Sequence, residues 1–157
     1  MGICIPLDSA SHGPGSVFTF RPYYRNIGWV GGFLDLLVHG SFHFGGWADL
    51  GVSATAVFIE QMKAMCRDGR GTAKLEINDP SALMTFSVLR EGEGSVGVHG
   101  VWRFTETLPE NLEVEEDLFH CAGLVVGFRG LLTDLSRLPG IVEAFERMLS
   151  KTPTSTE

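Results

Sequence analysis

The stretch from Phe58 to Glu76 constrains the fold most, because the spacing of its apolar residues changes part-way along. In its first half, apolar side chains recur at three- and four-residue intervals, as in a helix that buries one face: Phe58, Ile59, Met62, Met65 and Cys66. Gly69 and Gly71 give the backbone the freedom to end that helix and reverse. Apolar and polar residues then alternate up to Ile77, as in a half-buried strand. The pattern predicts a helix followed by a strand, with no catalytic motif inside it.

Strand patterns dominate the rest of the chain. Val17 to Tyr24 predicts a strand at a sheet edge, because Pro22 has no N–H to donate to a neighbouring strand. After a glycine-rich turn, the stretch from Phe33 to Phe44 alternates over its whole length, which predicts a single strand. Three more strands are predicted beyond the helix and the strand that follows it, the first two joined by a tight glycine turn: Leu83–Arg90, Ser95–Phe104 and Leu118–Phe128.

A second helix is predicted at the end of the chain. Its apolar residues again recur at helical spacing: Ile141, Val142, Phe145, Met148 and Leu149. Pro139 suits a first helical turn, and Asp134 or Ser136 is placed to cap the exposed amides. Ser53 or Thr55 is the corresponding cap expected for the first helix.

We therefore predict a single α+β domain over residues 1–157. It contains an antiparallel sheet of about six or seven strands, one helix over residues 54–67 after the first strands, and one C-terminal helix over residues 137–149. Residues 1–16 are rich in Gly, Pro and Ser, which predicts a loose N-terminal lead-in unless Ile3 and Ile5 form a short edge strand. Residues 151–157 are expected to fray.

Composition narrows the classes of function. The chain has 157 residues, of which 44% are hydrophobic, so it can form a globular core without disulfide or metal cross-links. A net charge of −7 opposes nucleic-acid binding, which requires clustered Lys and Arg. Three cysteines without paired spacing argue against a disulfide framework and a cysteine zinc site. With no signal-peptide or membrane-spanning pattern, we expect a cytoplasmic protein without cofactor or metal.

The polar face of the strand predicted over 33–44 contains the side-chain types of a hydrolytic or metal site: Asp35, His39, Ser41 and His43. Residues four apart on one strand face are separated by about 13 Å, so His39 and His43 cannot hold one metal ion unaided. We therefore expect a solvated sheet face with no catalytic residue, on which Asp35, His39 and His43 contact a partner. The alternative is a metal or small-molecule site that recruits His99.

A run of acidic residues follows the predicted strand over 95–104, without an intervening Lys or Arg: Glu106, Glu110, Glu113, Glu115, Glu116 and Asp117. Such a run keeps a loop solvated and the protein soluble. It is also suited to attract a basic surface, so these acids are further candidates for partner binding.

Two other motifs favour structural roles. Gly92 to Gly97 matches G-x-G-x-x-G, but strands rather than a strand and a helix flank it, which favours a hairpin turn over a nucleotide loop. The tryptophans Trp29, Trp47 and Trp102 lie among glycines or in strands, where core or sheet packing is expected.

Three blocks of the chain together resemble the WapI-type family of bacterial immunity proteins. Phe58 to Met65, leading through Gly71 to Glu76, is similar to the central helix and strand of that family. Gly92 to Arg103 is similar to its glycine-started strand, and Asp134 to Leu149 to its terminal helix with a Leu-Pro start. These are packing and turn residues, so the resemblance identifies no binding residue in this chain.

The resemblance implies a non-enzymatic cytosolic protein that binds a toxin domain and occludes its active site. A domain that binds a metal or small molecule through His39, His43 and His99 is the alternative. A third hypothesis is a homo-oligomeric subunit that pairs through an exposed sheet edge. The resemblance does not define the partner or the oligomeric state.

Overall fold

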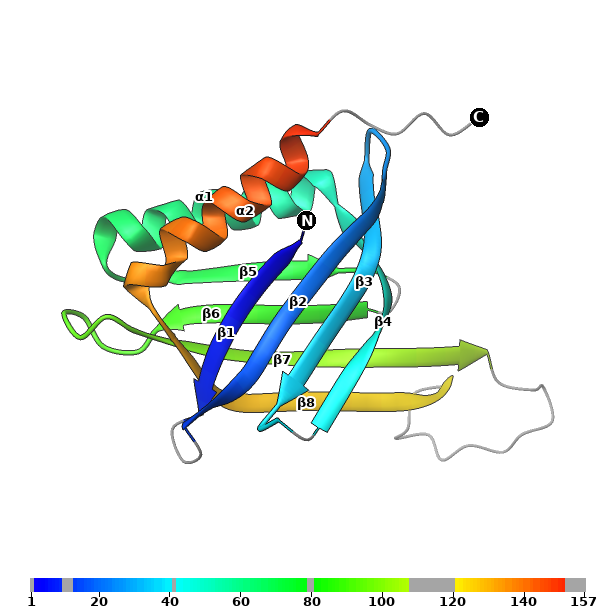
Figure 1. Cartoon of the computed structure of the whole chain (residues 1–157), viewed down its shortest axis with the longest axis horizontal. Helices are drawn as coiled ribbons and strands as arrows, with labels where there is room; N and C mark the ends of the chain where they lie inside the picture. The colour runs from blue at the N-terminus through cyan, green and yellow to red at the C-terminus, as the bar shows by residue number, and fades with distance from the viewer. Residues whose placement is uncertain (1, 10–12, 41, 79–80, 108–120, 152–157) are drawn as a thin grey trace.

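The computed structural model describes residues 2–9, 13–40, 42–78, 81–107 and 121–151 (Figure 1). Within these ranges the first half of the chain forms β1 (Ile3–Ser9), β2 (Gly13–Arg25), β3 (Trp29–Val38), β4 (Phe42–Gly51) and α1 (Val52–Asp68). The second half forms β5 (Thr72–Ile77), β6 (Ser81–Val88), β7 (Ser95–Thr107), β8 (Cys121–Asp134), the short 3₁₀ helix η2 (Leu135–Arg137) and α2 (Leu138–Ser150).

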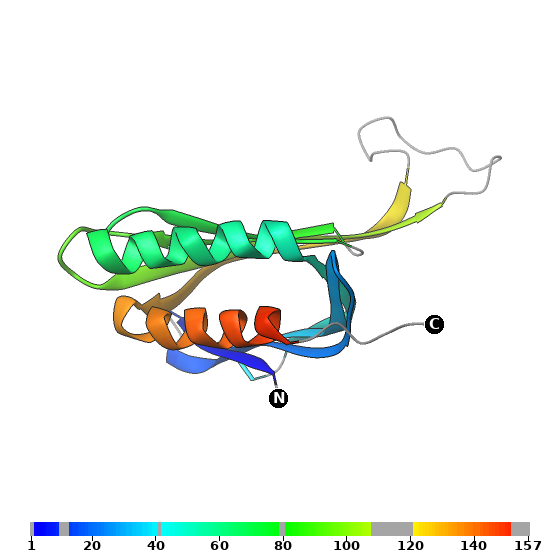
Figure 2. The same cartoon turned by 90° about the horizontal axis from the view of Figure 1, so that it is seen from above.

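All the strands belong to one antiparallel sheet of eight strands, in the order β4-β3-β2-β1-β8-β7-β6-β5. The fold is therefore α+β, as predicted, with more strands than expected. The sheet curves strongly, so that β1–β4 and β5–β8 form two facing layers with both helices alongside (Figure 2). Its two edge strands meet at one point, where Asp49 and Asn78 exchange backbone hydrogen bonds of 2.9 Å.

The core fills the inner face of this curved sheet. Buried side chains come from alternate positions of each strand and from one stripe of each helix, as the period-2 and helical patterns require. Phe58 of α1 lies at the centre, with its ring centroid 5.6 Å from that of Phe86 in β6 and 5.1 Å from that of Phe145 in α2. The helices therefore join the two layers of the sheet through aromatic packing.

The N-terminal residues are not a loose lead-in. Ile3, Ile5 and Leu7 are buried, and β1 lies between β2 and β8. Proline is tolerated at position 6 because β1 pairs with β8 only at Asp8 and Ser9. The alternation of Ile3 to Ser9 outweighs the turn-forming composition around it. At the other end of the chain, the tail predicted over residues 151–157 lies almost entirely outside the described residues.

The strand containing Pro22 is interior rather than at an edge. β2 pairs with β1 on one side and β3 on the other. The paired stretch of β1 begins at Ile3, opposite Phe20, so Pro22 lies beyond it and faces no ladder partner there. A register shift between Pro22 and Tyr24 also accommodates the proline in the pairing with β3.

The helices match the predicted elements with small corrections. α1 begins at Val52 and has no side-chain cap, so neither Ser53 nor Thr55 caps it. Cys66 is exposed, although its spacing placed it on the buried stripe. Asp134 caps the turn before α2 as expected, accepting a 2.8 Å hydrogen bond from the Ser136 N–H.

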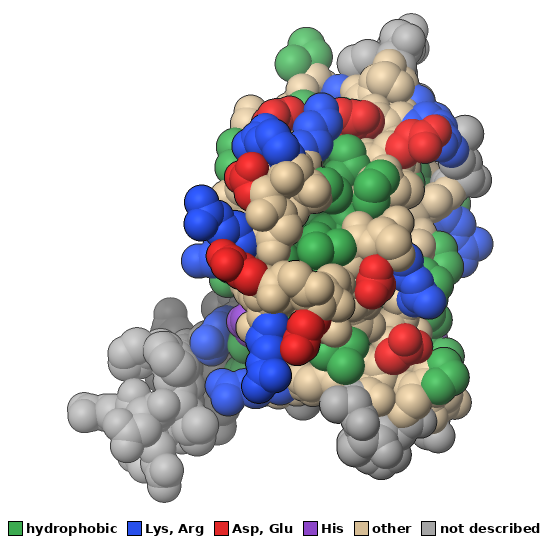
Figure 3. Space-filling model, turned by 90° about the vertical axis from the view of Figure 1, so that its left-hand side faces the viewer, with side chains coloured by type: hydrophobic (Ala, Val, Ile, Leu, Met, Phe, Trp, Pro, Cys, Tyr) green, Lys and Arg blue, Asp and Glu red, His purple; other side chains and the backbone are tan. Residues whose placement is uncertain are grey.

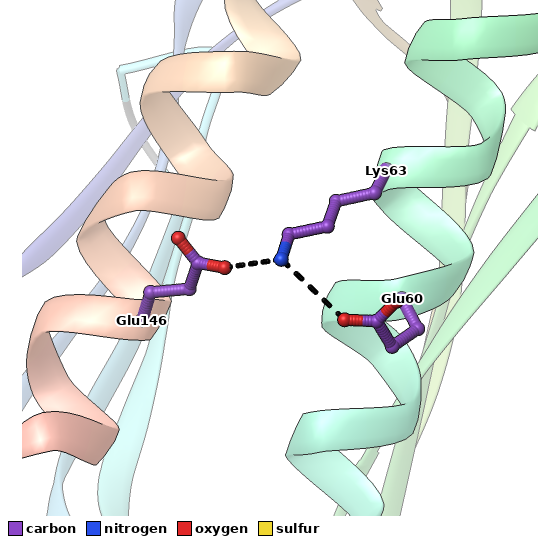
Figure 4. A network of polar contacts seen from close by, with 3 residues as sticks. All are labelled: Glu60, Lys63 and Glu146. Atoms are coloured by element: carbon purple, nitrogen blue, oxygen red, sulfur yellow. Dashed lines mark hydrogen bonds and ion pairs between the residues drawn. The ribbon is translucent and has the colours of Figure 1, made fainter.

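A polar contact ties the outer sides of the two helices together. Lys63 of α1 lies 2.5 Å from a carboxylate oxygen of Glu146 in α2 and 3.4 Å from Glu60 (Figure 4). The hydrogen bond to Glu146, followed by the charges of both glutamates, raises the pKa of Lys63. These side chains are largely solvated, so the aromatic core rather than this network sets the helix packing.

The Asp134 cap gives a pH-dependent prediction. Its hydrogen bonds with Ser136 lower the pKa of the carboxyl, so the charged form stabilises the fold at neutral pH. That contribution is present above the unfolded pKa of about 4 and is lost as the pH falls through the lower folded value. Asp134→Ala is expected to lower the urea midpoint modestly at pH 7, and the difference from wild type should shrink in acid. A difference that grows on acidification would contradict the capping role.

Candidate functional site

Among the residues that the structure describes, the most unusual surface is the outer face of β2, β3 and β4. Four aromatic residues lie there, and we call them the aromatic face: Tyr23, Trp29, Phe33 and Trp47. Their exposed fractions are 59%, 41%, 50% and 43%, respectively. Single exposed apolar residues are ordinary on protein surfaces, whereas several neighbouring aromatic ones indicate a binding surface.

Strand register brings the members of the aromatic face together. Phe33 of β3 is directly opposite Trp47 of β4, and their ring centroids are 6.1 Å apart at 83°. Tyr23 of β2 completes a triangle, with its centroid 6.0 Å from Phe33 and 6.4 Å from Trp47. These distances and the edge-to-face orientations are typical of favourable aromatic pairs. The rings support one another while leaving a large apolar area in contact with water.

A glycine and a carboxylate hold the Trp47 indole in place. The indole N–H donates a 3.1 Å hydrogen bond to Asp49 Oδ1 on the same face of β4. The ring lies over Gly31 of β3, where an added Cβ would be only 2.7 Å from Trp47 Cζ2 and 2.8 Å from Asp49 Oδ1. The absence of a side chain at Gly31 therefore allows the indole to lie flat against the sheet.

Gly31→Ala tests this arrangement. The added methyl group is expected to displace Trp47 and break its bond to Asp49, because those contacts are shorter than van der Waals separation. The expected result is a red-shifted tryptophan emission, since the indole moves further into water. Gly46→Ala is the matched control, because a Cβ there meets nothing within 4 Å. An unchanged spectrum for Gly31→Ala would contradict the packing of Trp47 on that glycine.

The side chains of Asp35 and His43 contact each other next to the aromatic face. His43 Nε2 lies 2.5 Å from Asp35 Oδ1, and the two side chains are 63% and 40% exposed. The prediction of one strand from Phe33 to Phe44 was therefore wrong, because the chain reverses after Val38 and folds β4 back on β3. His39 lies in the turn with φ of 54°. The reversal brings together two residues that a single strand would hold apart.

The histidines do not gather into one site. His99 lies on β7, which β2, β1 and β8 separate from β3 in the sheet order. Within the part of the chain that the structure describes, no three His, Cys, Asp or Glu side chains are placed to hold a metal ion. Arg103 also lies on β7, so it is not on the face that carries Asp35.

The acidic candidates are almost all outside the described residues. Glu106 lies in β7, where its backbone is paired with Ala122 of β8. The other members of the run are in the undescribed part of the chain: Glu110, Glu113, Glu115, Glu116 and Asp117. Their partner-binding role therefore stays a prediction.

The aromatic face was missed because two tryptophans were assigned to packing. Trp102 is buried with 1% exposure, as expected, but Trp29 and Trp47 are not core residues. The alternation of β3 begins at Trp29 rather than at Phe33. Extending the period-2 pattern back through the glycines to Trp29 places it and Phe33 on the polar side with Asp35.

Other surfaces are less distinctive. A groove at β5, β6 and β7 is lined by Glu76, Leu83, Val101 and Arg103 among others, and its apolar members are aliphatic. Another side of the molecule carries interspersed acidic and basic side chains, with no broad area of one sign (Figure 3). Aromatic side chains dominate binding energy more often than aliphatic ones, so the aromatic face is the stronger candidate.

Comparison with family models, with curated proteins and with solved structures finds no match to this chain. Neither α1 nor α2 has the length and apolar character that a membrane crossing requires.

Proposed function

We propose that this chain is a non-enzymatic protein-binding domain, and that its partner docks on the aromatic face. The observation that carries the proposal is the cluster of Tyr23, Phe33 and Trp47, whose rings touch one another while 59%, 50% and 43% of these residues stays exposed. Leaving this apolar area in water is unfavourable, so a partner that covers it gains binding free energy.

The β4 side of the aromatic face favours a protein partner with basic residues, whereas the exposed Arg21 of β2 lies opposite Phe33 on the other side. Asp35 and Asp49 place carboxylates beside the rings, on strands β3 and β4. The whole chain has a net charge of −7, which speeds the approach of a positively charged protein. Aromatic anchors with charged neighbours are a frequent composition of protein interfaces.

The resemblance to WapI-type immunity proteins suggests the kind of partner, a toxin domain whose active site the chain occludes in the cytoplasm. The three blocks that carry the family resemblance lie in α1 with β5, in β7 and in α2. A looser similarity covers Trp29 and the stretch Ala48 to Leu50, on the strands of the aromatic face.

Co-expression tests this function. The chain is produced in cells together with each polymorphic-toxin domain found among the neighbouring genes, and growth and co-purification are measured. Rescue of growth with a stoichiometric complex is the expected result. A toxin that stays lethal and does not co-purify with the chain would overturn the immunity proposal.

A further inference from the structure

Among the described residues, the edge of β4 has backbone groups without a ladder partner beside the aromatic face. In an antiparallel pair, residues alternate between those that bond across the pair and those that point away from it. The N–H and C=O of Asp49 both bond to Asn78, so they point away from β3. The register of β3 with β4 is continuous, so His43, Gly45 and Trp47 present their backbone groups to the same side.

The pairing of this edge with Asn78 stops at Asp49. Among the described residues, Asp49 with Asn78 is the only bridge between the β4 edge and the β5 side of the sheet. Further along β4, Gly45 and Gly46 border a small opening of about 10 Å³, which Ile77 and Trp102 also line. A strand added beside β4 would therefore pair with the β4 backbone and lie next to this small apolar opening.

We propose that an extended segment of the partner protein adds to the sheet along His43, Gly45 and Trp47. This inference rests on the proposed protein-binding function and specifies how the partner binds. The alternating N–H and C=O groups of a strand edge are satisfied by another extended polypeptide, as in β-augmentation. The side chains of β4 do not obstruct it at Gly45 and Gly46.

The two sides of the added strand meet different chemistry. Side chains on the outer side contact Trp47 and approach the carboxylates of Asp35 and Asp49, which favours Lys or Arg. Side chains on the inner side face the opening bordered by Leu34, Ile77 and Trp102, whose volume of about 10 Å³ has room for an apolar side chain no larger than that of alanine. The segment that fits this edge alternates cationic and small apolar residues.

A second copy of the chain fits this edge less well. Pairing two β4 strands would bring together two chains that each carry a net charge of −7. It would also place the Asp35 and Asp49 carboxylates of both copies on one continuous outer face, where like charges repel. A cationic strand at the same place would instead be attracted to these carboxylates.

Position 46 allows the edge to be blocked without changing the aromatic face. Gly46 lies at the opening, and a Cβ there meets nothing within 4 Å, so Gly46→Ala leaves the edge accessible. Gly46→Glu places a charged side chain at the edge, a device by which natural sheets prevent pairing. Its negative charge attracts a cationic peptide, so a loss of binding cannot be caused by repulsion.

The experiment uses a capped seven-residue peptide of alternating Lys and Ala, with the wild-type chain, Gly46→Ala and Gly46→Glu. Wild type and Gly46→Ala should bind it, and Gly46→Glu should bind at least tenfold more weakly. Amide exchange followed by NMR should slow at His43, Gly45 and Trp47 when peptide is added to wild type. A peptide with alternate N-methylated amides should not bind wild type, a result that does not depend on how any variant folds.

Three results would overturn the proposal. They are equal peptide binding by both Gly46 variants, no binding to wild type at millimolar peptide, and unchanged exchange at the three β4 amides. Light scattering could instead show that the free protein is a dimer, with these amides already protected from exchange. That result would assign the edge to a second copy of the chain. The co-expression test does not depend on these outcomes, so partner binding through the aromatic face is judged separately from edge pairing.

Discussion

Phe58→Ala is expected to lower the free energy of unfolding by about 3–5 kcal/mol, the range found when a buried phenylalanine is truncated. Phe58 is 1% exposed and contacts the rings of Phe86 and Phe145, so its removal leaves a cavity between both helices and the sheet. Urea denaturation followed by circular dichroism measures the change. The loss is large because one side chain joins α1, α2 and β6.

Val57→Ala is the matched control for that prediction. Val57 precedes Phe58 in α1 but is 56% exposed, so its truncation removes little buried area. Its unfolding free energy should stay within about 0.5 kcal/mol of wild type. Equal losses for the two variants would show that Phe58 is not at the centre of the core.

Trp47→Ala is expected to weaken binding to the proposed toxin partner by at least about 2 kcal/mol, or roughly 30-fold, the effect of losing a central aromatic anchor. Trp47 contacts Tyr23 and Phe33 and is hydrogen-bonded to Asp49, so it holds the aromatic face together. Because 43% of it is exposed in the free protein, folding should change little. Titration calorimetry and urea denaturation separate the two effects.

Val125→Ala controls for the loss of an exposed apolar side chain elsewhere. Val125 lies on β8 and is 59% exposed, outside the aromatic face. Its affinity for the proposed partner should equal that of wild type. An equal drop for Val125→Ala and Trp47→Ala would place the interface on a different surface.

The helices were predictable because their apolar residues keep a helical period over several turns and glycine or proline marks their ends. The stripe from Phe58 to Met65 and the stripe from Ile141 to Met148 are both buried as expected. Tertiary packing altered only details, such as the exposure of Cys66 and the uncapped start of α1.

The β3–β4 hairpin was not predictable from alternation. Val38 pairs with Phe42, four residues further along the chain. Because this separation is even, the alternation of apolar and polar residues runs through the turn without a break. His39 has a positive φ although it is not glycine. Gly40 was therefore the only residue that marked the turn in the sequence. The pairing of Asp35 with His43 and the facing of Phe33 with Trp47 both depend on this reversal.

The aromatic face therefore emerges only after folding. Its members come from three strands and are spaced irregularly in the sequence, so no local motif contains them. A period-2 pattern shows which residues share a face of one strand, but strand order and register decide which faces meet. The N-terminal strand shows the same limit, since its buried residues alternate but its central place in the sheet depends on β8.

Hydrogen exchange of the complex with the proposed toxin partner, read by mass spectrometry, tests the central claim most directly. If the partner docks on the aromatic face, amides in β4 and in the adjoining parts of β2 and β3 should become protected. The outer strands β5 and β6 should exchange as in the free protein. Protection confined to β5–β8, with β4 unchanged, would contradict the assignment of the aromatic face as the binding surface.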